Sequence, residues 1–185
     1  ERLNRGGFKP DLFLGLPKVV SEAKAWSAAD IPDRPHMEPD GLAWFQSCLA
    51  QATVYLEFGS GGSTVMAKRA GVPDIYSVES DRGYFDAVKE KVYGLAEEAR
   101  VRMFYIDIGP TKERGWPVDT SNANRWSNYV RVPWDALVTD NKRPDLILID
   151  GRFRVACFLY TLLFASPGTR ILFDDYFDRT HYHVV

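Results

Sequence analysis

A glycine-rich segment carries the clearest chemical signal in this sequence. Gly59, Gly61 and Gly62 stand between the mainly apolar run Val54–Phe58 and a segment with a helical pattern. Glycines let the backbone turn tightly and approach a ligand closely, and a helix N-terminus offers unpaired N–H groups to an anion. The segment therefore predicts a loop that binds a carboxylate or phosphate group of a ligand.

Carboxylates end four of the five strands that we expect in this chain. They are Glu79, Asp107, Asp150 and the pair Asp174–Asp175. In an open parallel sheet, ligands bind beyond the carboxyl ends of the strands, so these acids should line one crevice. Glu79 stands about 20 residues after the first strand, the spacing at which an acid can bind the hydroxyls of a ribose.

Two residues indicate which nucleotide the crevice would take. The dinucleotide fingerprint requires a third glycine where this chain has Thr64. Glu57 lies inside the first strand, where it would be costly beside a pyrophosphate but favourable beside an ammonium group. Both features favour S-adenosylmethionine, whose methionine part carries an ammonium group, over a nicotinamide dinucleotide.

These motifs resemble those of a known superfamily. The run Leu56–Thr64 resembles the first motif of class I S-adenosylmethionine-dependent methyltransferases, and Val78–Asp81 resembles the acidic motif after their second strand. The resemblance extends from Val54 to Tyr176. Three further segments are similar to an uncharacterised bacterial group of methyltransferase-like proteins: Asp107–Pro110, Ile149–Val155 and Phe173–Tyr176.

The resemblance implies a set of cofactor contacts. Those at the methionine end are Glu57, Gly59, Ser60, Gly61 and Gly62. Those at the ribose are Glu79 and Ser80, those at the adenine are Asp107 and Ile108, and Asp150 lies beside the methyl group. The superfamily's sheet has seven strands whereas this sequence predicts five, so we expect the last two to be disordered or missing from this chain.

Asp150, Arg152 and Asp174 are the residues that we expect nearest to the chemistry. Methyl transfer depends mainly on proximity and orientation, with a base required only when the acceptor must lose a proton early. Asp150, Asp174 and Asp175 also resemble the Mg²⁺ ligands of metal-dependent catechol-type O-methyltransferases. However, Asp175 stands where those enzymes have asparagine, and their lysine is absent. Mg²⁺ is therefore an alternative that we do not favour, and we predict no bound metal.

Other polar and aromatic residues leave alternatives open. Arg152 and Arg154 flank Phe153, and each guanidinium could recognise an anionic acceptor or pair with Asp174 or Asp175. Two histidines after the last strand could supply a base or lie at the surface, and four aromatic residues could form an acceptor lid or a packing cluster. The histidines are His181 and His183, and the aromatic residues are Trp116, Trp126, Tyr129 and Trp134.

The elements that position these residues alternate between strand and helix. This pattern predicts an α/β fold with a doubly wound, mostly parallel sheet and helices on both faces. The expected strands are 54–58, 74–79, 101–106, 145–149 and 169–173, and the expected helices are 41–51, 63–70, 84–99 and 154–165. Asp40 is predicted to cap the first helix. Residues 108–133 are expected to form a long connection.

Breaker residues distinguish the beginning of the chain from the rest. Frequent Gly and Pro predict an irregular arm over residues 1–40, with one short helix at Lys18–Ser27. Residues 41–185 are then a single S-adenosylmethionine-binding domain, a size that supports one core.

Composition limits the classes of partner. The net charge of −2 offers no bulk attraction to nucleic acid or anionic membranes, and no apolar run is long enough to span a bilayer. Cys48 and Cys157 lie in apolar stretches, which indicates reduced core residues and a cytoplasmic protein. The oligomeric state, including a homo-oligomer, stays open.

The sequence predicts a methyltransferase that acts on a small-molecule or saccharide acceptor. The alternative is a catalytically inactive nucleotide-binding module or subunit of the same fold.

Overall fold

A five-stranded parallel sheet forms the centre of the computed structural model, which describes residues 25–185. Its strands are β1 (Val54–Phe58), β2 (Asp74–Glu79), β3 (Arg100–Tyr105), β6 (Leu146–Ile149) and β7 (Arg170–Phe173). They lie in the order β3-β2-β1-β6-β7, and every neighbouring pair is parallel. The chain winds outward from β1 to β3 and then returns to β6, so the topological switch point lies between β1 and β6. The predicted doubly wound fold is confirmed.

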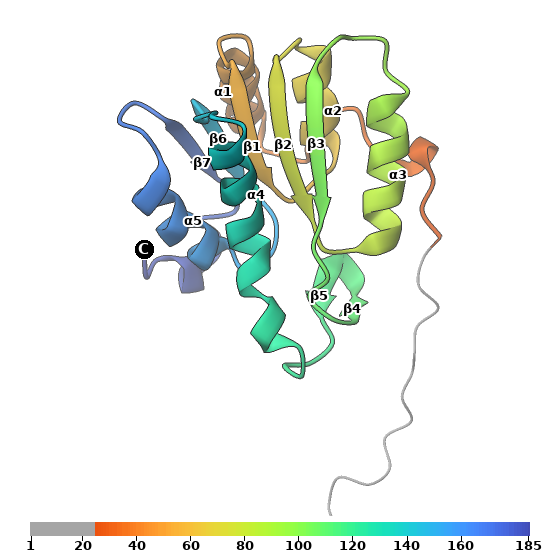
Figure 1. Ribbon diagram of the computed structural model, residues 1–185, viewed down its shortest axis with the longest axis vertical. Helices are drawn as coiled ribbons and strands as arrows, with labels where there is room; N and C mark the ends of the chain where they lie inside the picture. The colour runs from red at the N-terminus through yellow and green to blue at the C-terminus, as the bar shows by residue number, and fades with distance from the viewer. Residues whose placement is uncertain (1–24) are drawn as a thin grey trace, which may run out of the picture.

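Helices cover both faces of this sheet (Figure 1). One face packs against α1 (Pro39–Leu49), α2 (Gly62–Arg69) and α3 (Arg82–Tyr93), and the other against α4 (Ser127–Thr139) and α5 (Arg154–Phe164). Successive strand residues point to opposite faces, so in β1 Tyr55 joins the first core and Leu56 the second. Cys48 and Cys157 are buried and free, one in each core, as predicted.

Two predicted helix boundaries are wrong. Helix α1 begins at Pro39 and has Glu38, not Asp40, at its N-cap, because proline lacks the N–H that the first helical position leaves unpaired. Helix α3 ends at Tyr93 rather than continuing to residue 99. Gly94 follows it and weakens the helix at the point where the chain must turn into β3.

Helix α4 was not predicted: it begins inside residues 108–133, the segment that we expected to be a long connection, and extends beyond it to Thr139. Pro133 lies within this helix, although proline in a helix interior costs about 3 kcal/mol. Tyr129, Val130, Trp134 and Leu137 recur at helical spacing and are buried against the sheet. Burial of this apolar face offsets the cost of the proline.

The same segment contains a short antiparallel hairpin, which was also not predicted. It consists of β4 (Thr111–Lys112) and β5 (Trp116–Pro117) and lies beyond the carboxyl end of β3 (Figure 1). Gly115 at its tip has a φ of +69°, and a Cβ atom there would lie 3.2 Å from Ser80 Oγ. The hairpin is therefore in close contact with the residues that follow β2.

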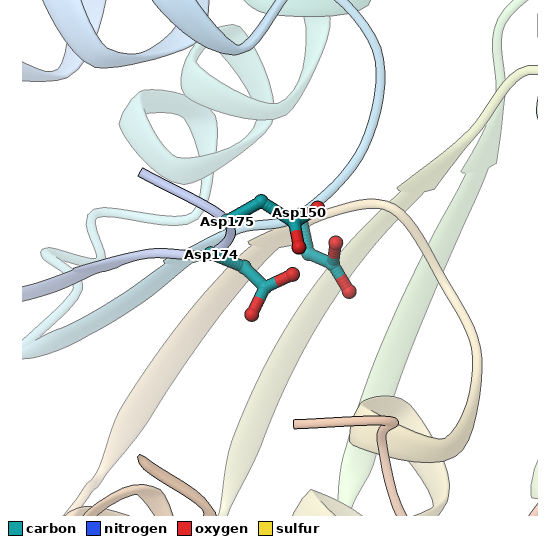
Figure 2. Close-up of side chains that lie close together, drawn as sticks. All are labelled: Asp150, Asp174 and Asp175. Carbon is teal, nitrogen blue, oxygen red and sulfur yellow. The ribbon is translucent and has the colours of Figure 1, made fainter. Parts of the chain in front are cut away.

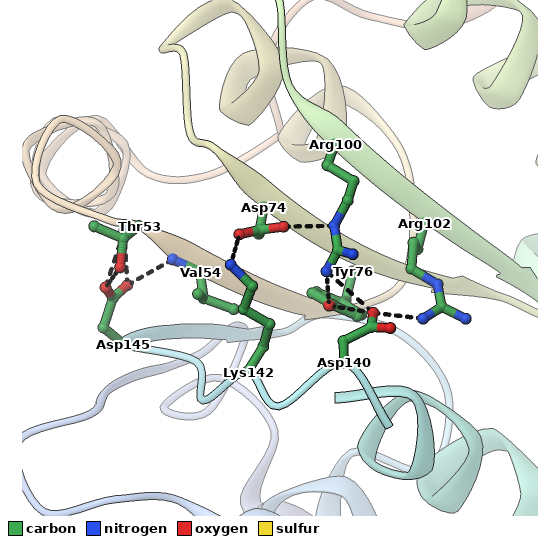
Figure 3. Close-up of polar contacts among 9 residues, drawn as sticks. All are labelled: Thr53, Val54, Asp74, Tyr76, Arg100, Arg102, Asp140, Lys142 and Asp145. Atoms are coloured by element: carbon green, nitrogen blue, oxygen red, sulfur yellow. Dashed lines mark hydrogen bonds and ion pairs between the residues drawn. The ribbon is translucent and has the colours of Figure 1, made fainter. Parts of the chain in front are cut away.

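The opposite, amino edge of the sheet is held by a paired charge network (Figure 3). Asp74 accepts hydrogen bonds of 2.6 Å from both Arg100 Nε and Lys142 Nζ. Asp140 accepts one of 2.6 Å from the Tyr76 hydroxyl and another from Arg102. These carboxylates are already satisfied by protein groups, so this edge has a structural role.

Little of the predicted N-terminal arm can be compared with the structure. Residues 1–24 lie outside the described residues, and with them most of the helix predicted at Lys18–Ser27. The described part has a 3-10 helix at Ala28–Asp30, and Lys91 forms an ion pair of 2.7 Å with Asp33. None of the helices between residues 25 and 185 has both the length and the apolar character needed to cross a membrane.

Candidate functional site

The loop after β1 lies at the topological switch point, against the loop after β6. Gly59 has a φ of +104°, and a Cβ atom on it would lie 2.7 Å from the backbone nitrogen of Gly151. The Gly59 and Ser60 N–H groups donate to the Val78 carbonyl at 2.9 and 3.1 Å. Only glycine fits both this conformation and this contact.

Glu57 supports this loop from inside the protein. Its side chain is fully buried and accepts hydrogen bonds from the hydroxyls of Tyr55 (2.9 Å), Ser63 (2.6 Å) and Thr64. Burial raises the pKa of Glu57, and these hydroxyls lower it. The carboxylate thereby fixes the first turn of α2. The direct contact between Glu57 and an ammonium group stays a prediction.

The hydroxyl and N–H groups of the loop itself are also largely engaged in hydrogen bonds within the protein. Ser60 and Ser77 share a hydrogen bond of 2.6 Å between their hydroxyls, and Gly61 N–H donates to Thr64 Oγ1 at 3.0 Å. Gly62 lies in close contact with the backbone of Arg34, whose carbonyl oxygen would be 2.2 Å from a Cβ atom at Gly62. A ligand at this loop would therefore meet backbone surface shaped by three glycines.

Glu79 ends β2 beside this loop. Its Oε1 accepts hydrogen bonds from the N–H groups of Ser80 (2.6 Å) and Asp81 (2.9 Å), whereas its Oε2 has no hydrogen-bond partner in the described part of the chain. Burial raises the pKa of Glu79 to about 7. The glutamate thus offers one free carboxylate oxygen at the tip of β2. Ser80 contributes its backbone to this arrangement, and its side chain is buried.

Asp107 and Ile108, the two residues predicted beside an adenine, point in different directions. Asp107 is exposed, accepts from Gly109 N–H at 2.9 Å and forms an ion pair of 2.6 Å with Arg125. Ile108 is 1% exposed and packs in the second core, and its carbonyl accepts from Trp126 Nε1 at 3.0 Å. The Ile108 side chain is therefore part of the core, and the adenine contacts of Asp107 and Ile108 stay predictions.

Three aspartates meet at the ends of β6 and β7. Figure 2 shows the side chains of Asp150, Asp174 and Asp175 close together, and each offers an oxygen within 4.8 Å of the others. Arg154, which is 4% exposed, pairs with all three, at 2.7 Å to Asp150, 3.5 Å to Asp174 and 3.1 Å to Asp175. Of the two alternatives left open for Arg154, the structure shows pairing with the acids.

The environment of Asp150 favours its protonated form. Burial raises the pKa of Asp150, the charge of Asp174 raises it further, and Arg154 opposes both effects. Two carboxyl groups this close cannot easily carry two negative charges. The pair therefore shares a proton over part of the neutral pH range.

Arg152 has different surroundings from Arg154. Its guanidinium carbon lies 4.4 Å from the centre of the Trp116 ring. A pocket of about 410 Å³ opens beside these two residues. Its other lining residues are Gly151, Phe153, Arg154, Val155, Ala156, Leu159, His181 and Tyr182.

Comparison with solved structures now identifies the family. A methyltransferase-like protein from Silicibacter pomeroyi DSS-3 is 37% identical to this chain, with a TM-score of 0.69, over 82% of this chain and 79% of that one. This chain belongs to the same family of methyltransferase-like proteins. It is thus a member of the class I methyltransferase superfamily, as its motifs predicted.

The other comparisons add little. An O-methyltransferase from Bacillus cereus, solved with S-adenosylhomocysteine, is 21% identical with a TM-score of 0.48, over 79% of this chain and 60% of that one. No model of a protein family matches the chain, and no curated protein does.

The aspartate cluster of this methyltransferase-like protein does not fit a divalent metal. Three carboxylates would suit a hard cation such as Mg²⁺. However, the Arg154 guanidinium already contacts each of them, and Arg179 pairs with Asp175 at 2.7 Å. A divalent ion among these oxygens would lie next to a fixed positive charge. The cluster is therefore neutralised by arginine.

The predicted aromatic cluster and histidines divide between structural and site positions. Tyr129 and Trp134 are buried in the second core, and Trp126 packs on Phe153 with ring centres 5.0 Å apart. Trp116 alone of the four lies exposed at the pocket. His181 lines the same pocket, and His183 Nε2 lies 2.9 Å from the Tyr176 carbonyl oxygen.

Tyr84 is a site residue that the sequence did not reveal. It lies in the first turn of α3, and its hydroxyl would be 3.0 Å from a Cβ atom at Gly61. Burial, together with the charges of Glu79, Glu57 and Asp150, raises the pKa of Tyr84 to about 12. In the sequence, Tyr84 is distinguished only by its closeness to the acidic motif at Val78–Asp81, and this closeness does not separate a site residue from a surface residue.

Proposed function

We propose that this protein transfers a methyl group from S-adenosylmethionine to a small-molecule acceptor. The observation that carries the proposal is the junction at the switch point, where the glycine loop after β1 meets Gly151 and lies beside the free oxygen of Glu79. Ligands of doubly wound sheets bind in this crevice. Membership of a methyltransferase-like family supports the same reaction.

The residues of the crevice suit the parts of this cofactor. The Gly59–Gly61 backbone would accommodate the methionine portion closely, since a side chain at Gly59 would collide with Gly151. Glu79 would accept hydrogen bonds from the ribose hydroxyls. Asp107 lies beyond the end of β3 on the side expected for the base. When bound, the cofactor supplies an activated methyl group.

Asp150 is the residue that we propose to accept a proton from the acceptor. It directly follows β6 and precedes Gly151, which contacts the glycine loop. Burial and the charge of Asp174 raise the pKa of Asp150 to about 8, so the fraction of Asp150 that is ionised at neutral pH is a stronger base than an exposed aspartate. Arg154 holds its carboxylate at 2.7 Å and so orients it.

Calorimetry can test the cofactor assignment. We expect S-adenosylhomocysteine to bind and NAD not to bind under the same conditions. Glu79→Ala should weaken S-adenosylhomocysteine binding at least about tenfold, because charge-assisted hydrogen bonds to the ribose are lost. Binding of NAD alone, or an unchanged affinity in the variant, would contradict the proposal.

Turnover separates an active enzyme from a binding module of the same fold. The protein should form S-adenosylhomocysteine from S-adenosylmethionine when a small-molecule extract is supplied, and Asp150→Asn should slow this formation. Binding without any turnover would favour the module.

A further inference from the structure

The pocket beside Arg152 adjoins the crevice at the switch point. Gly151 lines this pocket and also contacts Gly59 of the glycine loop. Trp116 comes from the β4–β5 hairpin, residues 151–156 from the turn into α5, and His181 and Tyr182 from the end of the described chain. Its volume of about 410 Å³ is within the range of small-molecule sites.

Arg152 is a cation of this pocket that forms no ion pair with the residues that the structure describes, although the charge of Glu79 acts on it from farther away. Arg154 is paired with three aspartates, and Arg179 with one. By contrast, no carboxylate within residues 25–185 lies at ion-pair distance from Arg152, and its guanidinium has no hydrogen-bond partner there. Burial lowers the pKa of Arg152 because desolvating its charge has a cost, which the negative charge of Glu79 offsets only in part. An anion in the pocket would remove that cost.

Trp116 holds the guanidinium in a suitable orientation. The ring covers one face of Arg152 at 4.4 Å, a cation–π contact. Stacking uses the face of the guanidinium and leaves its in-plane N–H donors free. Those donors match a carboxylate in a bidentate geometry.

The other walls of the pocket are mainly apolar. Phe153, Ala156, Leu159 and Tyr182 contribute aromatic or aliphatic surface. An acceptor that fills the site therefore needs a flat or apolar body beside its charged group.

We infer that the pocket binds the methyl acceptor through Arg152 and that this acceptor is a small apolar or aromatic carboxylate. That the ligand is the methyl acceptor rests on the proposed function, whereas the anion site itself is inferred from Arg152 and Trp116. A carboxylate seated on Arg152 would place the rest of the molecule beside Gly151, next to the residue proposed to take its proton.

Benzoate and benzamide are matched probes because they differ only in the charged group. Saturation-transfer NMR on the whole chain should show benzoate binding at least about tenfold more tightly than benzamide, the difference expected for a charge-assisted bidentate contact. Arg152→Gln should remove this preference, and Arg152→Lys should restore only part of it. Arg131→Gln is the matched control, since it removes one exposed positive charge paired with Asp135 on α4.

Each result of these binding experiments either supports or overturns the inference. Equal binding of the two probes, undiminished benzoate binding by Arg152→Gln, or no binding of benzoate would overturn the inference. Competition by inorganic phosphate as strong as that by benzoate would also overturn it, because the apolar walls would then contribute nothing. The wild-type probe comparison stands even where a variant fails to fold. Arg152-dependent benzoate binding without S-adenosylhomocysteine binding would retain the anion site and refute the proposed function.

Discussion

Gly59 and Gly151 bring two loops from distant parts of the chain into backbone contact. A Cβ atom at Gly59 would lie 2.7 Å from the Gly151 nitrogen, and one at Gly151 would lie 2.7 Å from the Gly59 nitrogen. The contact joins the carboxyl ends of β1 and β6, where the crevice opens. Any side chain at either position would push the cofactor loop away from the residues proposed to act on the acceptor.

Gly59→Ala should therefore destabilise the protein by more than the cost of placing a Cβ atom at the positive φ of Gly59. A residue with a Cβ at positive φ costs roughly 1–2 kcal/mol, and the collision with Gly151 adds to this. Gly71→Ala is the control, because Gly71 also has a positive φ, +74°, but has nothing within 4 Å of its Cβ position. Urea unfolding should show the larger loss for Gly59→Ala. Equal losses would mean that the loops can separate freely.

Glu79→Gln should stabilise the protein at neutral pH while it weakens cofactor binding. The pKa of Glu79 is raised from 4.5 to about 7 by burial, so the folded state binds a proton more readily than the unfolded state. Stability linked to this group is complete below pH 4.5 and is lost as pH rises through about 7. Glutamine avoids this loss, and we expect a gain on the order of 1–3 kcal/mol at pH 8.

Unfolding of wild type and Glu79→Gln across this pH range measures the effect. The two stability curves should coincide near pH 4.5, diverge between about pH 4.5 and 7, and keep a constant separation above pH 7. Curves that stay parallel across the whole pH range would show that the glutamate titrates normally in the folded protein.

Arg154→Met should be strongly destabilising because it leaves three acids without their central cation. Breaking a buried ion pair by removing one partner typically costs about 3–5 kcal/mol. The loss should shrink at acidic pH, where the second carboxyl group of the Asp150–Asp174 pair also becomes protonated. Arg179→Met is the comparison, since Arg179 pairs with Asp175 alone at a partly exposed site. A pH-independent loss in Arg154→Met would assign the effect to packing.

Mg²⁺ should neither stabilise nor activate the protein. The Arg154 guanidinium already pairs with all three aspartates and so partly neutralises the charge that would attract a divalent ion. Thermal unfolding with Mg²⁺ or with a chelator should therefore give the same Tm, and methyl transfer should be unaffected by the chelator. A Mg²⁺-dependent rise in Tm would reinstate the metal alternative.

Local patterns in the sequence were enough to determine the sheet and to predict the edge at which a ligand would bind. The apolar runs around β1, β2, β3, β6 and β7 predicted all five strands, because side-chain periodicity and turn residues act over a few positions. The glycine loop and Glu79 followed from the rule that parallel strands end at one edge.

Only the tertiary structure decided which groups face one another. Burial of Tyr129 and Trp134 outweighs the helix-breaking tendency of Pro133, and that depends on a sheet surface formed by distant strands. The same is true of Arg154, which joins Asp150 of its own turn to Asp174 and Asp175 after the next strand, and of Arg152, which forms no ion pair within residues 25–185. The contacts of Trp134 and of Arg154 with Asp174 and Asp175 join separate segments of the chain, so no local pattern of charge or hydrophobicity could determine them.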